Sequence, residues 1–278
     1  SVINLIDNAT RSSIEQNGTS LKIISDTVGT YANSDIRLQV DGSTKMLLNS
    51  DSGILMGGTS AYNSFENGST NPRLQVRGTN LDGSCQAWIR ATGDAGAPKL
   101  FLANTRNTSG NSHTVVQNGD ELGGLFFTGS DGSQFVNGAS ITSNVGGSPG
   151  ADDVPGYLSF GTNSGGTSTT ERMRITSAGL MGIGINSPAR ILHLHESSSD
   201  TCQLHITNST TGTSGSDGVS FALGSDESLI INQRESNDIV LKTDDTDRLR
   251  IASDGEVHAT GGVLKLGTAD TSSAHLNS

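Results

Sequence analysis

The chain has 278 residues, of which 32% are hydrophobic, 4% are aromatic and 36 are glycine. This apolar content is too low for the large core that one globular domain of this length needs. The formal net charge of −11 argues against a nucleic-acid partner, because contacts with phosphates require a basic surface. The charged fraction of 16% is nevertheless low for a disordered chain. We therefore expect the chain to fold by sharing its apolar faces with copies of itself.

Sequence patterns typical of β-strands recur along the chain. Residues 37–40, 73–76 and 191–194 are short, apolar-rich and partly alternating, and clusters of Gly, Asn, Asp and Ser bound each of them. The apolar spacing of a helix is nowhere sustained over three turns, and each glycine costs a helix roughly 1 kcal/mol relative to alanine. The sequence therefore predicts an all-β fold.

One short pattern occurs three times. Residues 171–179 match residues 247–255, at an offset of 76 positions, and residues 45–53 form a degenerate copy with one extra residue. The spacing between the copies varies, which disfavours a solenoid built from a single chain. We expect a shaft with modules along it, divided as follows: 1–52, an N-terminal shaft segment; 53–178, a first repeat with a larger β insert; 179–254, a second repeat with a smaller β insert; 255–278, a C-terminal shaft end.

The repeated pattern has the alternation of a strand followed by a turn. Met173 and Ile175 in one copy, like Leu249 and Ile251 in another, point to one face of the strand, while arginines point to the other. The apolar pair can face the axis of an assembly, and the arginines can meet water or carboxylates of a neighbouring chain. The Gly that ends each copy allows a turn with positive φ.

The pattern resembles a repeat of phage tail fibres. The resemblance rests on residues 170–175, Gly182-Ile183-Gly184, Ser187-Pro188 and residues 191–194. Residues 119–127 and 150–160 look like a module that often precedes this repeat. The likeness covers roughly residues 45–270, with residues 1–44 only weakly included.

This resemblance implies an elongated, homotrimeric, intertwined β fibre with small β modules inserted between the repeats. It implies a structural protein of the virion tail fibre that supports host attachment and is not an enzyme. The expected partners are two further copies of the chain, other tail or baseplate proteins, and a host surface polysaccharide or protein receptor. No cofactor is expected. Two alternatives remain open, a polysaccharide-degrading tailspike and a head fibre or decoration protein of the virion.

No long apolar stretch is present, so we expect no membrane insertion. The two cysteines, Cys85 and Cys202, lie far apart, and we expect isolated thiols that are buried or half-buried. Such thiols fit assembly in a reducing cytoplasm. The chain begins at Ser1 and stops at Ser278 without a chaperone domain, so we expect a processed product or part of a longer protein.

Some short segments of the chain fit part of a known catalytic or ligand-binding motif but lack a feature that the motif requires. Residues 146–150 satisfy Gly-x-Ser-x-Gly, but the residue after the serine is Pro149, which has no N–H for an oxyanion hole. Gly182-Ile183-Gly184 lacks the third glycine and the helix of a dinucleotide loop. Residues 244–247 are rich in aspartate but lack the spacing of a calcium loop, so we interpret them as a turn. We expect no catalytic residue.

His193 and His195 are the candidates for a metal site. On a strand the two imidazoles share a face, so three copies around a threefold axis would present six nitrogens to an octahedral metal. In the favoured interpretation Leu192 and Leu194 face the axis and the histidines face solvent. Trp88 is interpreted as a core residue rather than a sugar platform.

Overall fold

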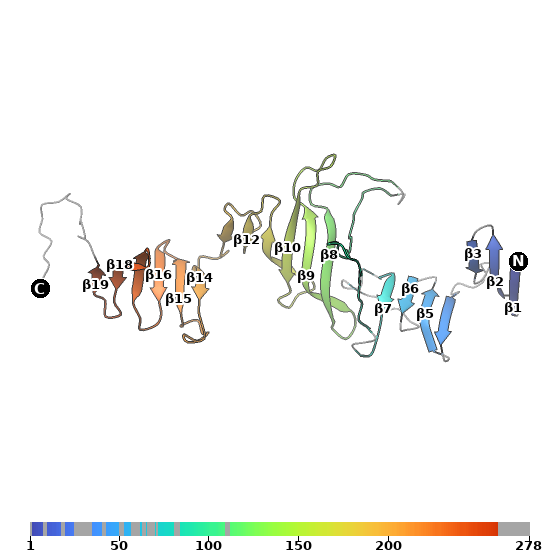
Figure 1. Cartoon of the computed structure of the whole chain (residues 1–278), viewed down its shortest axis with the longest axis horizontal. Coiled ribbons are helices and arrows are strands. Elements are labelled where there is room, and N and C mark those ends of the chain that lie inside the picture. Colours follow the sequence, from blue (N-terminus) through green and yellow to red (C-terminus); the bar gives the residue numbers. More distant parts are fainter. Residues whose placement is uncertain are drawn as a thin grey trace, which may run out of the picture. The chain divides into compact units, whose positions relative to one another are not determined.

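The computed structural model describes residues 2–7, 10–17, 20–24, 35–40, 43–49, 53–56, 62, 65, 70, 72–80, 84–108 and 112–260. These residues form nineteen β-strands arranged in five sheets (Figure 1). The all-β prediction is confirmed, and residues 37–40, 73–76 and 191–194 lie on strands or overlap them. Within the described residues, no helix is long and apolar enough to span a membrane.

The sheets follow the chain in order. The first contains β1 to β3: Val2–Asp7, Thr10–Asn17 and Ser20–Ile24. The second contains β4 to β7: Asp35–Val40, Ser43–Asn49, Gly53–Met56 and Leu74–Val76. The third contains β8 to β13: Glu121–Ser130, Phe135–Val145, Gly156–Thr162, Thr170–Ile175, Met181–Ile183 and Leu192–Leu194.

Two three-stranded sheets complete the described chain. The fourth sheet contains β14 to β16: Cys202–Ile206, Val219–Leu223 and Leu229–Gln233. The fifth contains β17 to β19: Ile239–Thr243, Thr246–Ile251 and Val257–Ala259. Both are antiparallel, whereas β6 and β7 of the second sheet pair in parallel.

The chain divides into two compact units, Ser1–His193 and Leu194–Ser278. The division falls within β13, close to the end of the third sheet. It does not test the boundaries expected from the repeats, at 52/53, 178/179 and 254/255, which remain predictions. Residues 261–278, which make up most of the expected C-terminal shaft end, lie outside the described residues.

The three copies of the sequence pattern occupy equivalent positions in three antiparallel meanders. These are β4–β5–β6, β10–β11–β12 and β17–β18–β19, and each copy supplies the central strand and the turn after it. Each meander contains a β-bulge that leaves one basic residue of the central strand without a paired partner in the preceding strand. The skipped residues are Lys45, Arg172 and Arg248.

The turn after the central strand is also shared. Gly179 donates its backbone N–H to Thr176 at 2.9 Å, and Gly255 donates in the same way to Ala252 at 2.9 Å. Their φ angles are 76° and 94°, and φ is 81° at Gly53 in the longer turn of the first copy. Only glycine adopts these angles without steric cost, so the glycine that ends each copy is required by the turn.

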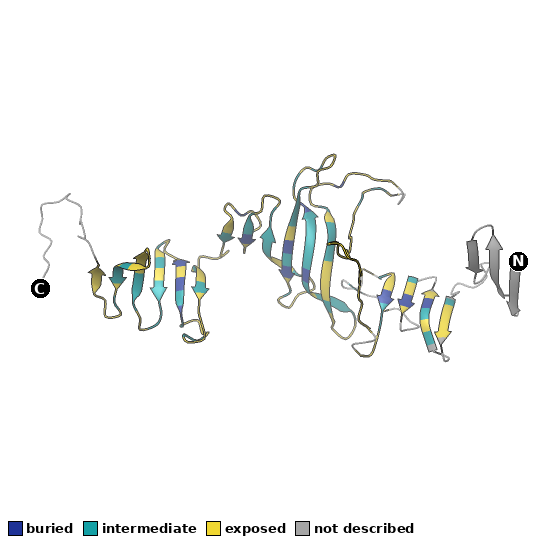
Figure 2. Ribbon diagram, viewed as in Figure 1, coloured by how far each residue is buried: buried dark blue, intermediate teal, exposed yellow. Residues whose placement is uncertain are grey.

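The hydrophobic core of the single chain is small. The buried apolar side chains of the described residues are Leu47, Leu55, Val116, Val145 and Ala222. Figure 2 shows strands coloured mainly as intermediate or exposed, with only short buried stretches. Most of the large apolar side chains therefore remain in contact with solvent in one copy of the chain.

Replacing Gly53 by alanine is expected to destabilise the protein more than the same change at Gly179. At both positions the positive φ angle costs alanine about 1 kcal/mol. A Cβ at Gly53 would in addition clash with the backbone carbonyl of Arg73, whereas a Cβ at Gly179 meets nothing within 4 Å. Chemical denaturation of the two variants measures the difference. Equal losses of stability would contradict a role for the close approach of Arg73.

Candidate functional site

The fourth sheet carries six large apolar residues on one face. Cross-strand pairs join Phe221 to Leu204 and Ile231, and join Leu223 to Leu229. Directly paired residues point to the same face of a sheet, so these side chains form one surface, together with Ile206. Their exposed fractions are 46% for Leu204, 49% for Ile206, 50% for Phe221, 55% for Leu223, 80% for Leu229 and 48% for Ile231.

Two small residues on the opposite face of the same sheet are nearly buried. Ser220 is 1% exposed and Ala222 is 6% exposed, and both alternate with Phe221 and Leu223 along β15. A strand in a folded domain normally buries its large apolar residues and exposes its small polar ones. The pattern of β15 is the inverse of this, because its large apolar residues are the exposed ones.

The fifth sheet continues this apolar surface. Ile239 pairs with Ile251, which pairs with Val257, and Leu241 pairs with Leu249. A mainly apolar hollow of about 170 Å³ is lined by residues of both sheets, among them Phe221, Ile231 and Ile239. The apolar faces of the fourth and fifth sheets therefore meet at this hollow.

An apolar row also crosses the third sheet. One residue from each of five neighbouring strands contributes to it: Leu125, Ile141, Phe160, Met173 and Ile183. Leu125 and Ile183 are 50% and 42% exposed, while the three between them are half-buried. Met173 thus lies on the apolar face that the sequence assigned to it.

The second sheet shows the same division. Leu38, Leu48, Ile54, Met56 and Leu74 are 37–60% exposed. The other face is different, because Leu47 and Leu55 are fully buried. We call these solvent-exposed apolar surfaces of the second to fifth sheets the apolar faces.

The arginines of the repeat have partners within their own chain. Arg174 donates two hydrogen bonds to Glu171, both at 2.7 Å, and these bonds raise the pKa of Arg174. Arg250 pairs with Asp247 at 2.8 Å and with Asp238 at 2.6 Å. The two skipped arginines also donate to nearby hydroxyls: Arg172 to Thr162 at 3.0 Å and Arg248 to Thr243 at 2.8 Å. These contacts satisfy the side chains without carboxylates from a neighbouring chain.

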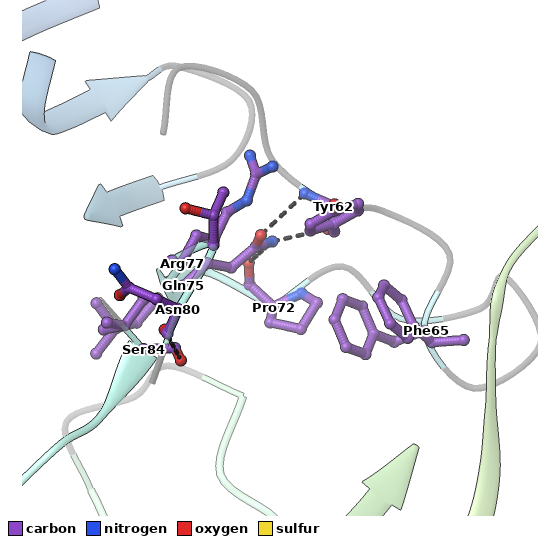
Figure 3. Close-up of a pocket in the computed structure, with 12 residues that line it drawn as sticks. Tyr62, Phe65, Pro72, Gln75, Arg77, Asn80 and Ser84 are labelled. Carbon is purple, nitrogen blue, oxygen red and sulfur yellow. Dashed lines mark hydrogen bonds between the residues drawn. The ribbon is translucent and has the colours of Figure 1, made fainter. Parts of the chain in front are cut away.

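A hollow of about 690 Å³ lies beside β7 (Figure 3). Gln75, which is 8% exposed, joins its walls: its side-chain amide donates to the carbonyls of Tyr62 at 2.7 Å and Pro72 at 3.2 Å, and accepts from the N–H of Tyr62 at 2.9 Å. Phe135 stacks on Phe65 and meets Tyr62 edge-on. The polar groups of Gln75 are engaged in holding the walls together, which indicates a structural role.

The candidate metal ligands do not form a site within one chain. His193 is half-buried and accepts a hydrogen bond from the backbone N–H of Ala189 at 3.2 Å, while His195 is exposed. In the part of a single chain that the structure describes, no three His, Cys, Asp or Glu side chains cluster closely enough to hold a metal. A site formed by three chains around an axis stays a prediction.

The structure also shows the two segments interpreted as turns, Trp88 and the two cysteines. Residues 146–150 lead into a turn that is closed by a hydrogen bond of 2.8 Å from the Gly150 N–H to the Asp153 carbonyl, and Asp244 and Asp245 occupy a turn with positive φ. Trp88 is 63% exposed, so its interpretation as a core residue is wrong for the single chain, because no described sheet covers it. Among the thiols, Cys202 is half-buried as expected but Cys85 is exposed.

The apolar face of the fourth sheet was not predicted from the sequence. Its signal was present in the alternation of residues 219–223, Val-Ser-Phe-Ala-Leu, which places three large apolar residues on one face. The stacking of Arg174 on the ring of Tyr157, at 3.8 Å from the ring centroid, was also missed. These residues are 17 positions apart and become neighbours only through the register of β10 and β11.

No protein-family model matches the chain, and no curated protein matches it. The solved structures that it resembles include the carboxy-terminal domain of the L-shaped tail fibre of bacteriophage T5, with 14% identity and a TM-score of 0.34. This match covers 70% of the present chain and 98% of the other. A second structure, of that domain with its intramolecular chaperone domain, has 15% identity, a TM-score of 0.34 and 70% coverage of each chain.

Acid is expected to loosen the loop that Arg106 and Asp120 hold together. Two hydrogen bonds from Arg106 and one from the backbone N–H of Gln117 lower the pKa of Asp120 from 3.8 to about 2. Because the folded-state pKa is lowered, the ionised carboxylate stabilises the fold above pH 3.8, and this contribution is lost as the pH falls toward 2. Hydrogen exchange of the Gln117 amide, corrected for its intrinsic rate, should therefore accelerate over this range.

The control for this prediction is Asp120→Asn, which removes the titrating group. In that variant the corrected exchange of Gln117 should show no step between pH 4 and pH 2, because the asparagine amide does not titrate. A step that persists in the variant would assign the acid sensitivity to another group.

Proposed function

We propose that this chain is a structural protein of a phage tail fibre, and that three copies assemble through their apolar faces. The observation that carries the proposal is the exposure of large apolar side chains on four successive sheets, above all on the fourth. The resemblance of residues 170–194 to a tail-fibre repeat supports the choice of protein class and of a threefold assembly. The expected role is to form a shaft that supports attachment to a host.

Hydrophobic burial provides the driving force for this assembly. Covering a Leu, Ile or Phe side chain that is half exposed contributes roughly 1 kcal/mol. The six residues of the fourth sheet would then contribute several kcal/mol per chain, which is comparable to the whole stability of a small domain. Identical chains suit this surface because each brings the same apolar face to a shared axis.

Charge is compatible with such an assembly. Three chains carry three times −11, or −33, which favours solubility and opposes lateral aggregation of finished fibres. Arg174 and Arg250 on the strands of the repeat are neutralised within their own chain, so they do not require a charged partner from another chain. The association we propose is therefore apolar at its centre and polar on its outside. Contacts with other tail or baseplate proteins and with a host receptor belong to the same proposal.

The mass of the purified chain in solution tests the assembly. Light scattering combined with sedimentation should give three times 28.7 kDa with a raised frictional ratio. A compact monomer would contradict the proposal, because the apolar faces would then have to be tolerated in water or covered within one chain.

Placing a charge in an apolar face should prevent assembly. In Phe221→Asp the carboxylate would be buried between chains without a partner, which is strongly unfavourable, so the trimer should dissociate at least tenfold more readily. Gln203→Asp is a matched control, because Gln203 is exposed on the opposite face of the same sheet. Sedimentation at a series of protein concentrations measures both variants. Equal behaviour would show that this face lies outside the interface.

A further inference from the structure

The face of the third sheet opposite its apolar row is mainly polar, although the exposed Phe126 also lies on it, and this face contains two neighbouring hollows. One is about 230 Å³ in volume and the other about 500 Å³. Tyr157 on β10 lines both of them. If the apolar face is covered by other copies, the polar face remains the accessible side of this sheet.

The smaller hollow is lined mainly by hydroxyl groups. Ser140 and Thr169 are hydrogen-bonded at 3.0 Å, and Thr142 and Ser159 at 2.8 Å, and in both pairs either oxygen can be the donor. Ser140 and Ser159 are 7% and 8% exposed. A Cβ on Gly161 would lie 2.8 Å from the Ser140 hydroxyl and 3.0 Å from that of Thr169, so this glycine leaves room for the hydroxyl pair. Such hydroxyls can exchange their mutual bonds for bonds to a ligand.

The larger hollow offers amides and further hydroxyls. Its polar lining includes Asn118, Thr176, Ser177, Asn186 and Ser187. Donors and acceptors of this neutral kind hydrogen-bond to alcohol groups without a requirement for charge.

One charged pair stands beside Tyr157. The Arg174 guanidinium lies over the Tyr157 ring and is held by Glu171 through two hydrogen bonds of 2.7 Å. Among the described residues that line the hollows, Arg174 is the one cation and Glu171 the one anion. Because they neutralise each other, the lining as a whole favours a neutral ligand over an acidic one.

The third meander shows that the arginine does not need an aromatic partner. Asp238 precedes Ile239, just as Tyr157 precedes Leu158, and these two apolar residues pair with Ile251 and Ile175 of their central strands. At this equivalent position Asp238 holds Arg250 with an ion pair of 2.6 Å. The ring of Tyr157 is therefore not required to build a meander, and it stands where the hydroxyl-lined hollows lie.

We infer that the two hollows beside Tyr157 form a binding site for a neutral saccharide, with one sugar ring in each hollow. Hydroxyl and amide groups would bond to the sugar hydroxyls, and the aromatic ring would pack against apolar C–H groups between the two sugars. This inference rests on the proposed function, because it assigns host recognition to a segment of the fibre. It places the contact on the side of the third sheet that assembly leaves open.

The test uses Tyr157→Asp, which reproduces the arrangement of the third meander and keeps a partner for Arg174. The labelled full-length protein is applied to an array of neutral and acidic bacterial surface oligosaccharides. The unchanged protein should bind neutral glycans, and the variant should bind them at least about tenfold more weakly, the size expected for losing one packed ring. Asp238→Asn, in the third meander, is the matched control and should bind as the unchanged protein does.

Mass and thermal unfolding of each variant separate this inference from the proposed function. If Tyr157→Asp unfolds, Ser140→Ala takes its place, because it removes one hydroxyl of the smaller hollow and keeps the ring. Three results would overturn the saccharide site alone: an unchanged trimer that binds no glycan, an unchanged trimer that prefers acidic glycans, or a folded trimeric variant, Tyr157→Asp or its replacement Ser140→Ala, that binds as well as the unchanged protein. A monomeric chain would overturn the proposed function.

Discussion

The fold depends on large apolar side chains that one copy of the chain cannot bury. Along β15 the alternation is strict, with Phe221 and Leu223 open to solvent and Ser220 and Ala222 enclosed. A three-stranded sheet has only two faces, and in the described residues neither the fourth nor the fifth sheet has a further layer packed over its apolar face. Hydrophobic burial is the main force that stabilises folded proteins, and the assembly that we propose would supply it to these sheets. The low apolar content of the sequence and the small core of the structure agree with this exposure of large apolar side chains.

The polar side of the sheets differs, because its arginines find hydrogen-bond partners on their own strand or on the neighbouring strand. Arg174 and Arg250 bond to acidic residues three positions earlier on their own strand, and Arg172 and Arg248 bond to a hydroxyl of the neighbouring strand. Short-range pairs of this kind form as soon as the strands align and do not need a second copy. The second and third meanders therefore each have a polar side whose charges are paired locally and an apolar side that stays exposed, which is the side that we propose takes part in assembly.

The sequence was sufficient to predict the class of fold and the direction of the repeat residues. Alternation in residues 171–175 and 247–251 placed Met173 and Leu249 opposite the arginines, and the glycine after each copy marked a turn with positive φ. The hollows beside Tyr157 could not be predicted, because Ser140, Ser159 and Glu171 lie on three strands and meet only through the register of those strands. The burial of Trp88 was also predicted wrongly, since residue type indicates a preference for burial but not which segment will provide the cover.

The bulge in each meander has a consequence for how such a chain can change over time. Skipping one residue at Lys45, Arg172 or Arg248 fixes which side chains face which way, and a slip by one position would exchange the two faces. The distance between anchors is free by comparison, at 126 residues from Gly53 to Gly179 and 76 from Gly179 to Gly255. Segments between anchors can therefore be exchanged, lengthened or lost by recombination while the flanking sheets keep their orientation. A chain built this way can acquire a new surface between two anchors while the meanders at the anchors stay unchanged.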